Sequence, residues 1–251
     1  MNRYRVAATY LLATCVVATS VFLPIYFLWY PGALFDQAGG RELVALIAGI
    51  DLVVGPVLIF IIYTPGKKGL AFDMAVIALV QATALAYGVY VLFQSRPVYI
   101  VFAKDRFELI RANDLDPAEL EKAKPGPYAS LPWTGPEVVA ARIPKDPKEQ
   151  MKLMDSALAG ADIQTFPRYY VAYAQLAQDA VARSAPLARL RELNPGAGPA
   201  IDRLVARHGG AEEALRFLPM RAGPLVDLTV LMAGASGEVL EIAALRPWEF
   251  K

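Results

Sequence analysis

Cysteine and histidine are nearly absent from this sequence, and their scarcity excludes several kinds of site. The only cysteine, Cys15, lies within the first apolar run. The chain after residue 93 therefore has no intramolecular disulfide and must fold on core packing alone. The only histidine is His208, so metal sites of the cysteine type and histidine-rich metal sites are both excluded.

Charged residues are scarce in the first third of the chain. Residues 1–93 carry only nine charges, whereas the whole sequence has 25 basic and 24 acidic residues. This contrast predicts a membrane domain over residues 1–95 and a polar domain of ordinary size over residues 96–251. The net charge of +1 gives no support to nucleic-acid binding, which needs a basic patch.

Three apolar runs predict transmembrane helices over about residues 6–30, 43–63 and 70–93. A spanning helix needs roughly 20 apolar residues. The first run is too long for the apolar core of a cleaved signal peptide, which has about 7–15 residues, so we expect an uncleaved anchor. Trp29 and Tyr30 then lie at its far interface, where amphipathic rings are favoured.

The basic residues of the short loops predict the orientation of these helices. Arg3 and Arg5 precede the first helix, and Lys67 and Lys68 lie between the second and the third, on the same side of the membrane. The opposite loop has only Arg41. Positive loops face the cytoplasm, so we expect a cytoplasmic N-terminus and an outer domain, which in a bacterium is periplasmic.

Two acids lie in or near the membrane. Asp73, near the start of the third helix, complements the helix dipole and can pair with the adjacent lysines. Asp51 lies deeper, where a carboxylate costs about 2.5–3.5 kcal/mol. It is either a packing lock, hydrogen-bonded to a tyrosine, a threonine or Gln81, or a contact for a polar group on a partner's transmembrane helix. Gly55 and Pro56 should kink the second helix.

The polar part of the chain predicts an α+β domain with N- and C-terminal β-hairpins that share one sheet. Capping and periodicity predict helices between the hairpins, with Met151, Met154 and Leu158 on one apolar face. The expected strands are residues 98–102, 106–111, 225–232 and 238–245, with a possible fifth at 137–143. The expected helices are residues 117–124, 147–159, 169–183, 186–194 and 199–208, and residues 125–136 form a loop.

Catalytic patterns are not visible in this sequence. No nucleophile elbow, phosphate-binding glycine loop or zincin pattern occurs. His208 is expected to be a half-buried residue at a helix C-terminus.

Features suited to binding are clearer. Arg168, Tyr169, Tyr170 and Tyr173 form a cluster of residue types that are enriched in interface hot spots. The alternative is that Tyr170 and Tyr173 belong to the core. Trp133, in a proline-rich loop with Tyr128 and Leu131, is the second candidate. Its alternative role is to staple that loop to its own domain.

Several segments resemble the type IV pilin accessory proteins of the TfpX/TfpZ kind. They include Trp-Tyr-Pro-Gly at 29–32, Gly-Ile-Asp at 49–51, Gly-Pro at 55–56, Pro-Gly-Lys-Lys at 65–68, Leu-Ala-Tyr-Gly at 85–88, Asp-Arg-Phe at 105–107 and Arg-Pro-Trp at 246–248. The resemblance covers nearly the whole chain and is most specific before residue 115. It implies an inner-membrane protein that assists assembly of type IV pili, without a reaction and without a cofactor.

The first hypothesis is therefore a non-enzymatic chaperone or assembly factor for a cognate major pilin. Its membrane helices would bind the pilin transmembrane helix near Asp51, Gly55 and Pro56, within the lipid bilayer. Its outer domain would bind the pilin head, and other proteins of the pilus assembly platform are further candidate partners. Two alternatives are a membrane-anchored periplasmic sensor or ligand-binding protein, and a membrane enzyme that uses Asp51 or surface acids.

Overall fold

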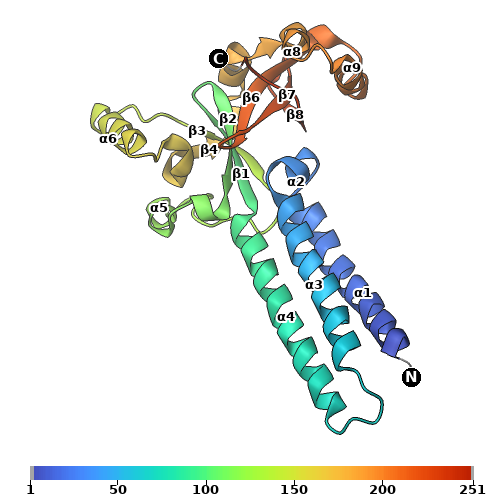
Figure 1. Cartoon of the computed structure of the whole chain (residues 1–251). Coiled ribbons are helices and arrows are strands. Elements are labelled where there is room, and N and C mark those ends of the chain that lie inside the picture. Colours follow the sequence, from blue (N-terminus) through green and yellow to red (C-terminus); the bar gives the residue numbers. More distant parts are fainter. Residues whose placement is uncertain (1–2, 250–251) are drawn as a thin grey trace.

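Three long helices extend from a domain built on one sheet (Figure 1). The structure is a computed structural model that describes residues 3–249. The long helices are α1 (Arg3–Trp29), α3 (Gly40–Ile62) and α4 (Leu70–Ser95), and each is long and apolar enough to cross a membrane. The short helix α2 (Ala33–Gln37) lies between α1 and α3. These bounds confirm the three helices expected from the apolar runs.

The middle position among the long helices belongs to α3, which packs against both α1 and α4 (Figure 1). At the turn before α4, the Nζ atom of Lys67 lies 2.6 Å from a carboxylate oxygen of Asp73. The expectation that Asp73 pairs with an adjacent lysine is confirmed. Pro56 lies inside α3, which continues through it to Ile62.

One mixed sheet forms the centre of the second domain. Its strand order is β4-β3-β1-β2-β6-β7-β8, and the short β5 pairs with β6. The strands are β1 (Pro97–Ala103), β2 (Arg106–Arg111), β3 (Glu137–Ala141), β4 (Tyr170–Ala172), β5 (Ala185–Pro186), β6 (Leu215–Gly223), β7 (Val226–Ala233) and β8 (Val239–Ala243). The β1–β2 and β7–β8 pairs are the two expected hairpins, and they do share one sheet.

Strand β6 joins the two hairpins, and the sequence did not predict it. It runs parallel to β2 and antiparallel to β7. Pro219 lies within β6, and a proline normally argues against an interior strand. Here Pro219 falls between the residues that pair with β5, up to Phe217, and those that pair with β2, from Met220. Its missing amide therefore interrupts neither of those two ladders.

The helix expected over residues 169–183 is wrong in its first half. Residues 170–172 form the edge strand β4, which pairs with β3, and a single helical turn follows at Tyr173–Gln175. Only α7 (Ala177–Arg183) is an α-helix. The spacing of Tyr170 and Tyr173 imitates a helical face, but pairing with a distant strand decides the local conformation.

Four further helices surround the sheet: α5 (Pro117–Lys122), α6 (Pro147–Leu158), α8 (Leu187–Leu193) and α9 (Gly198–Arg207). Asp116 and Asp146 cap α5 and α6, as the sequence predicted. The apolar face expected on α6 is wrong, because Met151, Met154 and Leu158 are exposed and Leu153 is buried instead. Helix α6 projects from the sheet, so only one of its sides meets a core (Figure 1).

Residues next to the membrane helices enter the core of the sheet. Leu34 on α2 and Ala38 just after it are buried with Leu218 and Leu228 on one face of the sheet. Strand β1 starts directly after α4. The sheet is therefore fixed to the long helices at two places, α2 and the α4–β1 junction.

Candidate functional site

Asp51 lies halfway along α3 and is only 5% exposed. Gln81 on α4 donates a hydrogen bond from Nε2 to the backbone oxygen of Asp51, at 3.0 Å. The hydroxyl of Tyr10 on α1 donates to Oε1 of the same Gln81. Gln81 thus links all three long helices, but it does so through the backbone of Asp51. Within residues 3–249, the Asp51 carboxylate has no ion pair and no hydrogen bond of its own.

Asp51 borders a hollow between the two outer helices, which we call the trough. The trough has a volume of about 230 Å³. Its lining comes from Tyr10, Ala13, Thr14 and Val17 on α1, Asp51 on α3, and Ala78, Gln81, Ala82 and Leu85 on α4. Since α3 is the middle helix, the trough has α3 as its floor and α1 and α4 as its walls. A second hollow of about 320 Å³ also borders Asp51 and is lined mainly by apolar residues of α3 and α4.

Gly55 is needed for the contact between α3 and α4. A Cβ atom at this position would overlap the side-chain amide of Gln81. Gly49, in the same helix, has no atom within 4 Å of the corresponding point. Gly55, next to Pro56, therefore has a packing role between two helices of the protein itself.

Trp133 lies where the membrane helices meet the sheet domain. Trp133 is 77% exposed, and its ring packs at a tilt against Phe93 at the end of α4, with 5.4 Å between ring centroids. Its backbone oxygen accepts a hydrogen bond from Nε1 of Trp29, at 3.0 Å. The backbone of this loop is held in place, while the Trp133 ring remains accessible beside the ends of α1 and α4.

Arg96 secures the same junction, although it is not among the residues expected from the sequence to have a function. It is 2% exposed and donates to the backbone oxygens of Phe93, at 2.5 Å, and Pro132, at 2.9 Å. Burial lowers the pKa of the Arg96 guanidinium. The sequence feature that could have identified Arg96 is its position directly between an apolar run and an expected strand.

The structure divides the cluster at residues 168–173. Tyr170 is buried and its hydroxyl donates to the backbone oxygen of Gln164. The hydroxyl of Tyr173 donates to the backbone oxygen of Gly237, at 2.6 Å, and burial raises the pKa of Tyr173 to about 12. Tyr170 and Tyr173 therefore belong to the core, which was the alternative to a role in binding.

Arg168 and Tyr169 remain at the surface. Arg168 forms an ion pair with Glu119 on α5, and its guanidinium lies 4.9 Å from the ring centroid of Tyr169. Within residues 3–249, no group of three or more His, Cys, Asp or Glu side chains could hold a metal ion. The accessible features are thus the trough at Asp51, the ring of Trp133, and the Arg168–Tyr169 surface.

Comparison with known proteins finds relatives among bacterial fimbrial proteins. Fimbrial assembly proteins of Dichelobacter nodosus serogroups E1 and I are each 32% identical to this chain over 187 residues, which is 74% of this chain and 72% of each relative. The chain belongs to the fimbrial assembly protein family. A further relative, from serogroups C1 and C2, is 33% identical over 121 residues, which is 47% of this chain and 92% of the relative.

Membership of the fimbrial assembly family confirms the resemblance to type IV pilin accessory proteins. No family model and no solved structure matches the chain. The three-helix array and its attached sheet domain therefore have to be interpreted from their own geometry.

Proposed function

We propose that this protein is a non-enzymatic assembly factor that holds a cognate type IV major pilin at the bacterial inner membrane. Its relatives are named as fimbrial assembly proteins, which supports a role in pilus assembly. Three membrane-length helices support a membrane-anchored protein. The short basic loops support a cytoplasmic N-terminus and a periplasmic sheet domain.

The unpaired Asp51 carboxylate carries this proposal. A carboxylate at mid-helix depth costs about 2.5–3.5 kcal/mol in a bilayer and normally faces a polar partner. The side chain of Gln81 contacts the Asp51 backbone and leaves the carboxylate oxygens without a partner. A polar group on a fourth helix, lying in the trough between α1 and α4, would satisfy those oxygens. The pilin transmembrane helix is the partner that we assign to this position.

The sheet domain would hold the pilin head on the periplasmic side. A pilin that waits for assembly is an inner-membrane helix with a periplasmic head, so a helper with spans and an outer domain can reach both parts. The accessible residues Trp133, Arg168 and Tyr169 belong to the residue types that dominate interface hot spots. Tyr170 and Tyr173 have no part in this surface, because both are held in the core.

Site-specific crosslinking from the walls of the trough tests the proposal. A photo-crosslinking residue at Val17 on α1 or at Ala82 on α4 should trap the cognate pilin in cells that express both proteins, since both positions are accessible and line the trough. Val80 is the matched control, because it is exposed on α4 but does not line the trough.

Adducts from both wall positions but not from Val80 would support a pilin helix in the trough. Equal pilin adducts from Val80 would show that pilin meets the helices without using the trough. No pilin adduct from Val17 or Ala82 would end the proposal.

A further inference from the structure

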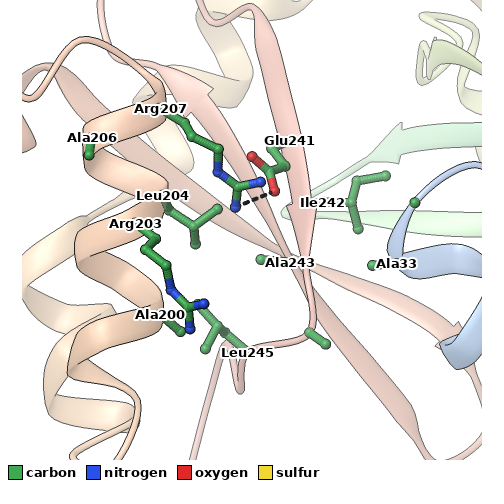
Figure 2. Close-up of a pocket in the computed structure, with 12 residues that line it drawn as sticks. Ala33, Ala200, Arg203, Leu204, Ala206, Arg207, Glu241, Ile242, Ala243 and Leu245 are labelled. Carbon is green, nitrogen blue, oxygen red and sulfur yellow. Dashed lines mark ion pairs between the residues drawn. The ribbon is translucent and has the colours of Figure 1, made fainter.

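The free edge of the sheet lies in a groove (Figure 2). Strand β8 is last in the strand order, so no strand among the described residues pairs with its outer side. The groove has a volume of about 890 Å³, and it is lined by the last three residues of β8, 241–243, and by residues 244–245 that follow the strand. Consecutive residues of a strand point to opposite faces of a sheet. Because three consecutive residues of β8 line the groove, it follows the strand edge and does not lie over one face.

Two helices form the walls of this groove. Ala200, Arg203 and Arg207 of α9 lie on one side, and Ala33 at the start of α2 lies on the other (Figure 2). An edge strand presents unpaired backbone N–H and C=O groups, and proteins commonly cover such an edge. Here the helices flank the edge and leave the space above it open. An extended segment satisfies those backbone groups by adding a strand, whereas a helix has no free backbone groups to offer along its length.

The charges of the groove select an acidic occupant. The carboxylate of Glu241 already has two partners, Arg207 at 3.0 Å and His208 at 3.0 Å. Arg203 donates from Nε to the backbone oxygen of Pro199, at 3.1 Å, and pairs with no acidic side chain within residues 3–249. One guanidinium on the α9 wall is therefore available to a carboxylate of a bound segment.

The groove begins close to the expected membrane surface. Gly32 and Ala33 line it and lie two and three residues beyond Tyr30, just after the end of α1. A partner whose helix lies beside α1 in the bilayer would emerge on this side of the protein. Its first extended segment outside the membrane would be within reach of β8.

We propose that the groove along β8 binds an extended segment of the pilin head as an added strand, with an acidic side chain of that segment paired to Arg203. The identity of the partner rests on the proposed function above. The strand geometry and the acidic character rest on the groove itself.

Crosslinking from the two ends of β8 tests this proposal in the full-length protein, co-expressed with its cognate pilin. Glu238 and Ala244 are exposed and flank the strand. Six residues of a strand span about 20 Å, at roughly 3.3 Å per residue. Photo-crosslinking residues at these two positions should therefore attach to pilin residues about six positions apart. A bound helix, at 1.5 Å per residue, would give about thirteen positions.

Charge reversal tests the acidic pairing. We expect Arg203→Glu to lower the yield of the Ala244 adduct by about fivefold or more, because it replaces an attraction with a repulsion. Arg183→Glu is the matched control, since Arg183 is an exposed arginine on α7 outside the groove. The adduct from Val17 in the trough should be unchanged in both variants.

Each of the other outcomes overturns one part of the proposal. Adducts about thirteen residues apart exclude strand addition, and an unchanged yield in Arg203→Glu excludes the acidic pairing. A Val17 adduct without any groove adduct overturns this proposal and leaves the proposed function intact. The absence of pilin adducts from both regions overturns both.

Discussion

The indole nitrogen of Trp29 donates a hydrogen bond to the backbone oxygen of Trp133, and this bond joins the end of α1 to the loop after α5. The ring of Phe93 lies between the two indole rings, 5.4 Å from each. Arg96 adds two hydrogen bonds at the same place. The sheet domain is therefore attached to the membrane helices by a packed junction, which fixes the direction in which the groove and the trough face.

Arg96→Ala should destabilise this junction by about 2 kcal/mol. Two hydrogen bonds from a charged donor are lost, but the Nε atom of Arg96 is buried without a partner, and its removal offsets part of the loss. Thermal unfolding of the detergent-solubilised protein measures the effect. Arg183→Ala, at an exposed position, should stay within about 0.5 kcal/mol of the parent. Equal melting temperatures for the Arg96→Ala variant and the parent would contradict the importance of the junction.

Gly55→Ala should loosen the contact between α3 and α4. The added methyl group displaces the amide of Gln81, which loses its bonds to Tyr10 and to the Asp51 backbone. Hydrogen bonds between membrane helices contribute about 0.6 kcal/mol each, so we expect a loss of about 1 kcal/mol. Unfolding in mixed micelles measures this loss. Gly49→Ala, where the new methyl group meets no atom, should cause no such loss, and equal destabilisation by both changes would refute the role of Gln81.

Neighbouring residues of α6 should respond differently to truncation. Leu153 is buried in the core beneath α6, so Leu153→Ala should cost about 2 kcal/mol, the lower end for a core leucine that retains slight exposure. Met154 is 61% exposed, so Met154→Ala should change stability by less than about 0.5 kcal/mol. Chemical denaturation of the two variants provides the comparison. A larger loss of stability in Met154→Ala than in Leu153→Ala would show that the apolar face predicted from the sequence is the buried one.

Tyr99 should make stability fall at alkaline pH. Burial, with smaller effects of Glu137 and Tyr128, raises the pKa of Tyr99 to about 12, against about 10 for an exposed tyrosine. Between these values the folded protein keeps a proton that the unfolded chain has lost. The stabilisation is therefore complete below about pH 10 and is lost as pH rises towards 12.

The difference between the parent and Tyr99→Phe isolates this effect, because lysine titration is common to both. The parent should be more stable at about pH 9, where the hydroxyl of Tyr99 donates to the backbone oxygen of Ser130. At about pH 11.5, the difference in denaturation midpoint between the parent and Tyr99→Phe should be smaller than at about pH 9. A gap that stays constant over this range would rule out the elevated pKa.

Local sequence patterns were sufficient for the elements that depend on local interactions. Apolar length predicted α1, α3 and α4, and capping aspartates predicted the starts of α5 and α6. Alternation predicted the two hairpins. Strand β4 was missed because its partner β3 is remote in sequence. Strand β6 was missed although its partner β7 follows it directly, because Pro219 within it argues against a strand. The side of α6 that is buried depends on where the sheet ends.

The candidate sites divide in the same way, into residues that the local sequence identifies and residues whose roles depend on distant contacts. Asp51 could be singled out because a carboxylate in an apolar run is costly on its own. The roles of Tyr170 and Tyr173 could not be decided, since they depend on contacts with Gln164 and Gly237 across the fold. The groove along β8 has no sequence signature, because α2, α9 and β8 are brought together only by the sheet.

Co-purification of the cognate pilin from detergent-solubilised membranes tests the central claim most directly. The full-length protein should retain pilin, and Asp51→Asn should retain markedly less, because an amide cannot replace the charge of the carboxylate in the trough. Asp73→Asn, at the pair with Lys67, should retain as much pilin as the parent. Failure of the parent to retain pilin, or equal retention by Asp51→Asn, would contradict a pilin helix held at Asp51.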